Sequence, residues 1–153
     1  PFGQMTLKEN IMVGLINKRF RLPKAYENRA MKILEQVGLA SQADNTAASL
    51  PLASRKKLEL ARVMSIDPKM MLLDEVFEGL SDQEIADIVA ILKSLRDAGI
   101  RLVMVEHVIR ALRQLATELV VFEKGRIIAQ GEINQVLDSD QVKQAYLGFG
   151  GSH

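Results

Sequence analysis

Apolar residues recur at helical spacing along the first part of the chain. Thr6 is followed three residues later by Glu9, and this capping-box spacing predicts a helix that runs through Ile16. A second helical pattern covers residues 23–37 and stops at Gly38, a residue that suits the left-handed end of a helix. The opening of the chain is therefore predicted to be helical.

Residues 40–49 break this pattern, because they are rich in Ala, Asn, Asp and Ser. They predict a loop with at most a short turn. A third helix is predicted over residues 54–65, ending before Asp67 and Pro68 because the residue before a proline disfavours helix. Residues 1–67 are thus predicted to form a helical subdomain.

Short, continuously apolar runs dominate the second half of the chain. Residues 70–73 precede Asp74 and Glu75, and residues 100–105 end shortly before His107. Each run predicts a strand buried on both faces. A helical pattern separates them, which predicts parallel strands with a right-handed crossover. Ligands bind at the carboxyl ends of such strands, where Asp74, Glu75 and His107 are expected to lie.

The remaining elements follow from turn and cap signals. Ser81 and Glu84 repeat the capping-box spacing at the start of the crossover helix, and Gly99 ends it. Residues 119–129 predict a hairpin with a tight turn at 123–126. Two short helices are predicted to close the chain.

Composition narrows the class of protein. The 153 residues contain no cysteine, which excludes disulfides and thiolate zinc sites. The formal net charge is +1, so no global field favours nucleic acid. Basic clusters at residues 55–57 and 18–21 are interpreted as solvated faces, not nucleic-acid patches. The chain shows neither a signal peptide nor an apolar run long enough to span a membrane, so a cytoplasmic location is expected.

Spacing alone leaves the roles of the polar residues open. Asp74 and Glu75 fit a turn or helix cap after a strand as well as they fit catalysis. A single histidine near a helix start, such as His107, is more often a structural hydrogen-bonding group.

Five segments together carry a much sharper resemblance, to the ATP-binding subunits of ABC transporters. Residues 2–10 are similar to the segment after the Q-loop, and residues 50–62 to the signature motif with its helix. Residues 71–75 are similar to the Walker B strand, residues 79–82 to the D-loop, and residues 103–107 to the strand leading to the switch histidine. Residues 145–148 resemble the ending of the branched-chain amino acid importer subunits. The resemblance implies an α/β fold, with a partial P-loop NTPase-like core in residues 68–153 behind the helical subdomain.

The resemblance also implies site residues. Asp74 would orient Mg²⁺ through water, and Glu75 would polarise the water that attacks the γ-phosphate of ATP. His107 would contact the γ-phosphate and sense whether it is intact. Asp82 would help to join two ATP-binding subunits. The signature-like loop would face a nucleotide held by the second subunit through Leu50, Pro51, Leu52, Ala53 and Ser54.

The sequence departs from the family pattern at these motifs. Residues 51–54 are Pro, Leu, Ala and Ser where the family usually has Ser, Gly, Gly and Gln, and Val76 replaces the usual Pro. No glycine precedes a lysine, so the P-loop pattern that cradles phosphates is missing from these residues. The expectation is the carboxyl-terminal portion of an ABC importer subunit, inactive alone, with weak or absent ATP and Mg²⁺ binding.

Expected partners are a second ATP-binding subunit and transmembrane permease subunits, which would place the protein peripherally at the inner membrane. Open sheet edges also predict self-association or an amino-terminal partner. Two alternatives stay open: a non-catalytic interaction module derived from such a subunit, and an unrelated hydrolase with a small metal site at Asp74, Glu75 and His107.

Overall fold

A computed structural model of the chain describes residues 1–16 and 23–149. The chain divides into two compact units, Pro1–Glu106 and His107–His153, and each is described by itself. The predicted boundary at residue 67 falls inside the first unit and stays a prediction. The basic cluster predicted at residues 18–21 lies outside the described residues. No helix in the described ranges is both long and apolar enough to cross a bilayer.

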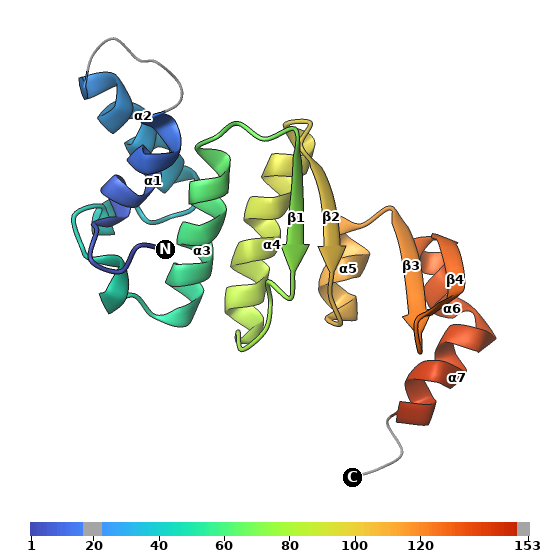
Figure 1. The fold of residues 1–153 in the computed structure, drawn as a ribbon. Helices are drawn as coiled ribbons and strands as arrows, with labels where there is room; N and C mark the ends of the chain where they lie inside the picture. Colours follow the sequence, from blue (N-terminus) through green and yellow to red (C-terminus); the bar gives the residue numbers. More distant parts are fainter. Residues whose placement is uncertain (17–22, 150–153) are drawn as a thin grey trace. The chain divides into compact units, whose positions relative to one another are not determined.

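The first helix, α1 (Leu7–Leu15), begins at the predicted capping box. The Thr6 hydroxyl accepts a hydrogen bond from the Glu9 N–H at 3.2 Å, and the Glu9 carboxylate accepts one from the Thr6 N–H at 2.8 Å. Helix α2 (Pro23–Gln36) is followed by Gly38, whose φ of 72° confirms the left-handed stop. The first two predicted helices are therefore confirmed (Figure 1).

Residues 40–49 form two short 3₁₀ helices, η2 (Ala40–Gln42) and η3 (Ala47–Ser49), in place of the predicted loop. Helix α3 (Leu52–Met64) begins two residues earlier than predicted. Pro51 is its N-cap residue, and its fixed φ near −58° already suits entry into a helix.

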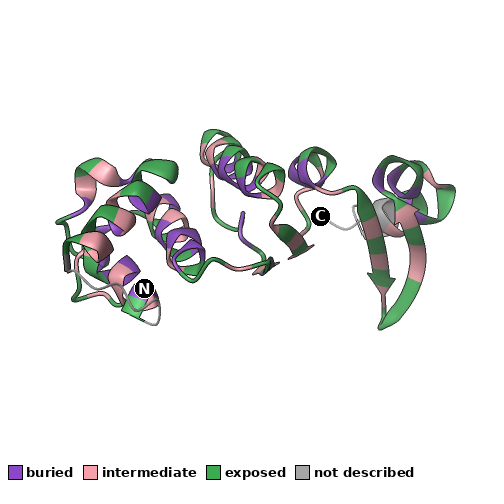
Figure 2. Cartoon of the chain, turned by 90° about the horizontal axis from the view of Figure 1, so that it is seen from above, coloured by how far each residue is buried: buried purple, intermediate pink, exposed green. Residues whose placement is uncertain are grey.

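A closed apolar core joins these helices. Its most deeply buried side chains, each 1% exposed or less, include Leu7, Ile11, Leu15, Ile33, Leu34 and Leu58. Figure 2 shows the corresponding buried positions along the helices of the first unit. Helix α1 packs so closely on the end of α3 that a Cβ at Gly14 would collide with the hydroxyl of buried Ser65.

The strands β1 (Met70–Asp74) and β2 (Arg101–Val105) pair in parallel, with Leu72 opposite Val103. Helix α4 (Asp82–Asp97) connects them and begins at the predicted Ser81 capping box. Gly99, at φ 92°, follows the end of this helix, as predicted. The strand–helix–strand prediction is confirmed.

The prediction that both strands are buried on both faces is wrong. Met71 is 2% exposed, but Leu72 is 76%, Val103 50% and Val105 64% exposed. Residues that are opposite each other in a parallel pair point to the same face, so these three side chains share one open apolar face. The apolar run in the sequence indicated a strand covered on both sides, whereas the described residues cover only one side.

The second unit is built on an antiparallel hairpin. Strands β3 (Glu118–Glu123) and β4 (Arg126–Glu132) are joined by Lys124 and Gly125, both at positive φ, which is the two-residue turn that the sequence predicted. The described residues of the unit also form three helices: α5 (Ile109–Leu115), α6 (Ile133–Asp138) and α7 (Asp140–Phe149). A small core of Leu112, Ile133 and Leu137 joins α5 to α6. The α/β fold with parallel strands and a carboxyl-terminal hairpin is confirmed.

Candidate functional site

The carboxyl end of β1 carries the two predicted acids. Asp74 is the last residue of the strand, lies opposite Val105 and is exposed. Glu75 follows in a left-handed conformation, with φ 46°, and is also exposed. A non-glycine residue rarely adopts this conformation, which costs roughly 1–3 kcal/mol and persists only where surrounding contacts hold it.

Three hydrogen bonds hold the Glu75 backbone. Its N–H donates to the Val105 carbonyl oxygen at 2.9 Å, at the end of β2. Its carbonyl oxygen accepts from the Glu78 N–H at 3.2 Å and from the Lys56 Nζ at 3.0 Å. Lys56 belongs to α3, so a side chain of the signature-like helix forms a hydrogen bond directly with the backbone of the candidate catalytic residue.

Glu106 holds the other end of the same turn. Its Oε1 accepts a hydrogen bond from the Phe77 N–H at 3.0 Å, and Phe77 is only 1% exposed. The second oxygen, Oε2, is shielded from solvent and has no hydrogen-bond partner among the described residues. The bond through Oε1 ties the end of β2 to the turn that follows β1, whereas the unpaired Oε2 costs free energy.

The signature-like loop enters α3 with both buried and exposed residues. Leu50 and Ala53 are buried, Ser54 is half-buried, and Pro51 and Leu52 are exposed. The N-cap residue of α3, Pro51, provides no side-chain hydrogen bond to the helix. The N–H groups of its first turn are therefore not used by a cap residue.

This loop lies beside the predicted D-loop. Gly79, at φ 75°, approaches Leu52 so closely that a Cβ placed there would lie 2.9 Å from the Leu52 Cδ2. Both the positive φ and the close approach favour glycine. Asp82 is exposed and is the first residue of α4, where a carboxylate is favoured by the helix dipole.

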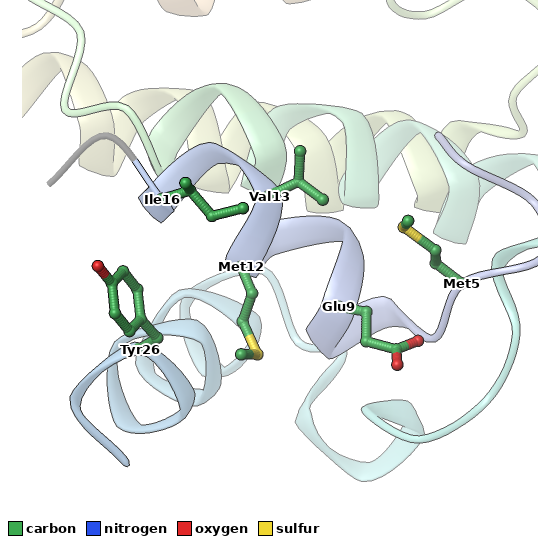
Figure 3. A pocket seen from close by; sticks show the side chains of 6 residues that line it. All are labelled: Met5, Glu9, Met12, Val13, Ile16 and Tyr26. Atoms are coloured by element: carbon green, nitrogen blue, oxygen red, sulfur yellow. The ribbon is translucent and has the colours of Figure 1, made fainter. Parts of the chain in front are cut away.

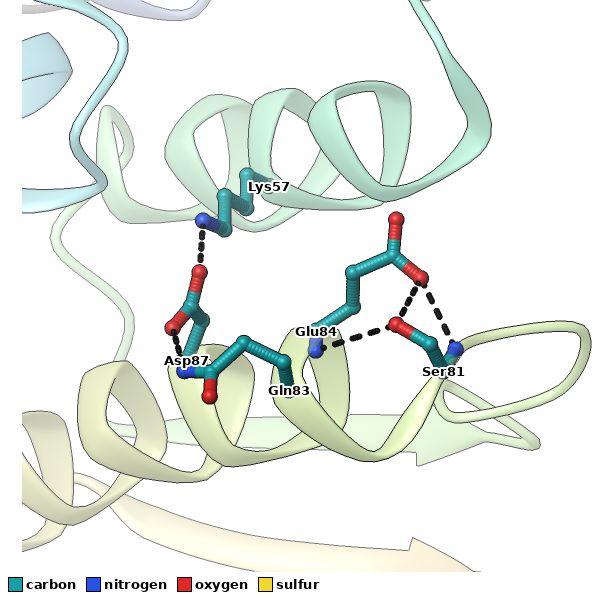
Figure 4. Close-up of polar contacts among 5 residues, drawn as sticks. All are labelled: Lys57, Ser81, Gln83, Glu84 and Asp87. Atoms are coloured by element: carbon teal, nitrogen blue, oxygen red, sulfur yellow. Dashed lines mark hydrogen bonds and ion pairs between the residues drawn. The ribbon is translucent and has the colours of Figure 1, made fainter.

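An ion pair joins α3 to α4. The Lys57 Nζ lies 2.8 Å from the Asp87 Oδ2, and the Gln83 Nε2 donates to the Asp87 Oδ1 at 3.3 Å (Figure 4). The hydrogen bond from Lys57, followed by that from Gln83, lowers the pKa of the Asp87 carboxyl. Lys56 and Lys57 thus make specific contacts, while the interpretation of residues 55–57 as a solvated face and not a nucleic-acid patch stays a prediction.

The first unit therefore gathers Asp74, Glu75, the signature-like loop and the D-loop. His107 is exposed and is the first residue of the second unit, and its role stays a prediction. Sequence reasoning missed the contacts of Lys56 and Glu106. Glu106 offered a signal, since it is an acid directly after an apolar strand, whereas nothing in the sequence distinguished Lys56 from its basic neighbours.

The described residues do not support a metal site of their own. In residues 1–16 and 23–149, no group of three or more His, Asp or Glu side chains is arranged to hold a metal ion. The alternative of a metal held by Asp74, Glu75 and His107 stays a prediction, because the first two residues belong to the first unit and His107 to the second.

A groove of about 320 Å³ lies on the helical part of the first unit, away from the strands (Figure 3). It is lined mainly by apolar side chains of α1 and α2 and the residues beside them: Met5, Glu9, Met12, Val13, Ile16 and Tyr26. Glu9 is the one acid in this lining, and its pKa is lowered by hydrogen bonds from the backbone and side chain of Thr6.

Known proteins resemble the chain along nearly its whole length. It is 31% identical over 147 residues to the lipopolysaccharide export system ATP-binding protein LptB of Haemophilus influenzae, covering 96% of this chain and 61% of that protein. It is 30% identical to the high-affinity branched-chain amino acid transport ATP-binding protein BraF of Pseudomonas aeruginosa, covering 96% and 64% respectively. The chain thus spans about three fifths of the length of these relatives.

A solved structure shares the fold. MJ1267, described as an ATP-binding cassette of an ABC transporter, superposes with a TM-score of 0.82 at 30% identity, over 95% of this chain and 64% of that one. The sequence profile of the family described as ABC transporter matches residues 1–78, about half of the chain. This match takes in the signature-like loop, β1 and the Glu75 turn, and the chain therefore belongs to the ABC transporter family.

Proposed function

We propose that this chain is the carboxyl-terminal part of the ATP-hydrolysing subunit of an ABC transporter and acts on ATP only with a polypeptide that supplies the P-loop. The observation that carries the proposal is the junction around Glu75. An exposed carboxylate stands at the end of a parallel strand, its backbone is fixed in a costly conformation, and the signature-like helix is fastened to it.

Glu75 suits the role of general base. A carboxylate can accept a proton from the water that attacks a γ-phosphate, provided that it is held within hydrogen-bond reach. Its exposure leaves it open to such a water, and its fixed backbone limits where the side chain can go. His107, as the switch residue, would hold the same water and the γ-phosphate.

Asp74 fits the part of a Mg²⁺ ligand. Mg²⁺ keeps several waters and usually takes one or two carboxylates together with substrate phosphates. Asp74 offers one exposed carboxylate at the strand end, and so it would hold the ion through water while a bound ATP supplies the phosphate oxygens. The ion would neutralise charge on the phosphates.

The open face of β1 and β2 supports the need for a further segment, in the same polypeptide or another. Leu72, Val103 and Val105 are 76%, 50% and 64% exposed, and residues 1–153 contain no Gly-Lys pair followed by Ser or Thr. A segment with a P-loop and its own strands would cover this face and bind the phosphates. Until it does, we expect the chain to self-associate, and gel filtration at rising concentration would show the increase in apparent mass.

The test is reconstitution. The chain is mixed with a separately purified fragment that carries the P-loop of a related cassette, and phosphate release from Mg-ATP is measured. We expect no turnover from either component and measurable turnover from the mixture. Glu75→Gln should abolish it, while Glu78→Gln, an exposed glutamate three residues later, should not. Turnover by the chain alone would contradict the proposal.

For the transported solute we propose branched-chain amino acids. Two features support this: the similarity to BraF and the ending at residues 145–148. LptB, which acts in lipopolysaccharide export, is at least as similar in sequence, so the solute must be tested directly. Complementation of a leucine-uptake mutant by the joined chain and P-loop segment would support the proposal, and rescue of an export mutant alone would contradict it.

A second candidate function is a non-catalytic docking module. The apolar groove on α1 and α2 favours it, since that groove is formed within the first unit and is independent of the strand face. Under either candidate, the proposed partner at this groove is a permease subunit at the inner membrane. Binding to permease without any reconstituted turnover would select the second candidate.

A further inference from the structure

The contact between α3 and Glu75 has a consequence for catalysis. Glu75 adopts φ 46°, and a glutamate gains nothing locally from this conformation. Something outside the turn must therefore hold it. Of the three backbone hydrogen bonds of Glu75 described above, two are main-chain bonds, and only that from Lys56 comes from a side chain.

We propose that Lys56 is a positioning residue that sets the backbone of Glu75 and thereby aims its carboxylate. The Lys56 ammonium lies 3.0 Å from the Glu75 carbonyl oxygen and provides a charged donor, which forms a stronger hydrogen bond than a neutral one. The carbonyl already accepts the Glu78 N–H, so the ammonium adds a second donor on the same oxygen and favours the peptide orientation that faces α3.

The contact links two motifs of the site. Lys56 lies one turn into the helix that the signature-like loop begins, so a displacement of this helix changes the support of the Glu75 carbonyl. Lys56 does not need to touch nucleotide or water to act in this way. Its function rests on the proposed role of Glu75 as the general base, but its structural effect does not.

Neighbouring residues provide a matched comparison. Lys57 has the same charge and length and belongs to the same helix, but among the described residues its ammonium pairs with Asp87 on α4. Lys56→Met and Lys57→Met therefore remove the same group from adjacent positions with different partners. Lys56→Arg keeps a charged donor at the first position.

The first measurement uses the chain alone and NMR. The Cα and carbonyl shifts of Glu75 report its left-handed backbone, and hydrogen exchange of the Glu78 amide reports the bond to the same carbonyl. We expect Lys56→Met to move both, with exchange about tenfold faster for one lost charged hydrogen bond. Lys57→Met should leave both unchanged, and Lys56→Arg should restore most of the wild-type signal.

Amides in the core of α4, such as that of Leu92, serve as the internal reference, because a general loss of stability would speed their exchange equally. If Lys56→Met does not stay folded, Lys56→Gln is measured in its place. An unchanged Glu75 backbone in a folded variant would overturn the proposal.

The second measurement uses the reconstituted mixture with its P-loop fragment. A misaimed base slows chemistry and leaves nucleotide binding intact, so Lys56→Met should lower kcat about tenfold with little change in KM for ATP. Equal kcat in Lys56→Met and Lys57→Met, despite a shifted Glu75 backbone, would overturn the catalytic part. Failure of the mixture to turn over at all would count against the proposed function, while the NMR result would still decide the structural part.

Discussion

The helical part of the first unit and its strand pair differ in how completely their apolar side chains are buried. Around α1, α2 and α3 most of the large apolar side chains are buried, with Leu34 fully buried, although Leu52 and Val63 of α3 are 45% and 40% exposed. In β1 and β2, by contrast, Leu72 is 76% exposed although it belongs to an equally apolar run. Helices bury one stripe and can close a core among themselves, whereas a parallel sheet needs layers on both faces. The difference indicates that the helices bury a core among themselves, whereas one face of the strand pair stays open among the described residues.

Truncation of core leucines should give the largest contrast between the two regions. Leu34→Ala removes packed methyl groups from the sealed core and should lower the free energy of unfolding by about 2–5 kcal/mol. Leu72→Ala removes a side chain that already faces solvent, so its effect should stay within about 0.5 kcal/mol. Urea denaturation of both variants measures this.

A large cost for Leu72→Ala would break the comparison, because it would mean that the open face is covered in solution. Repeating the measurement at several protein concentrations then distinguishes association between chains from a cover within one chain, since only the former depends on concentration.

The close contact of α1 and α3 should give the next largest effect. Gly14→Ala places a Cβ against the Ser65 hydroxyl, which is buried and donates to the Arg62 carbonyl at 2.6 Å. We expect a loss of about 1–3 kcal/mol, against the usual gain from replacing a helical glycine by alanine. Thermal or urea unfolding measures it.

The double variant with Ser65→Ala identifies the cause. It removes the colliding oxygen, so a favourable coupling between the two substitutions is expected. Gly3→Ala is the matched control, because a Cβ there meets only Ala48 at an ordinary 3.6 Å. Additive losses in the double variant would show that the collision is not what Gly14 avoids.

Local features of the fold could be predicted from the sequence, whereas the burial of the strands could not. Thr6 with Glu9, and Ser81 with Glu84, predicted two helix starts correctly because capping depends on neighbours three residues apart. The parallel pair and the hairpin were predicted for similar reasons: apolar runs and a turn of two residues are local signals. The strands' burial was predicted wrongly, since an apolar run does not say whether its second layer lies within the same residues.

The candidate site was predicted in part. Asp74 and Glu75 lie at the expected strand end, but the left-handed Glu75 and its contact with Lys56 depend on a helix nineteen positions away in sequence. Such a contact has no local signature, because any of three consecutive basic residues fits the sequence equally well. Only the rotation of α3 decides which of them reaches the turn.

The two capping boxes allow a comparison at smaller scale, one in each region. Thr6→Ala and Ser81→Ala should each cost about 1 kcal/mol. Both caps lower the pKa of a glutamate: Glu9 through the backbone and then the side chain of Thr6, and Glu84 through the side chain and then the backbone of Ser81.

A lowered carboxyl pKa gives the caps a pH dependence. The stabilisation is present above the ordinary value of 4.5 and is lost as the pH falls through the lowered folded-state pKa. Urea midpoints measured from neutral pH down to acid should therefore fall less steeply in each cap variant than in the wild type. An identical acid slope in all three proteins would show that the caps do not protect these carboxylates.

The smallest expected effect tests how tightly the two regions are joined. The ion pair between Lys57 and Asp87 links α3 of the helical part to α4 beside the strands, and 43% of the Asp87 side chain is exposed. A partly solvated pair of this kind contributes up to about 1 kcal/mol, because water and salt screen it. Lys57→Met, Asp87→Asn and the double variant measure the coupling by urea denaturation, and raising the salt should reduce it. A coupling well above that size, insensitive to salt, would mean that the two regions unfold together because of this contact. The stability of the helical part could then not be considered apart from that of the strands.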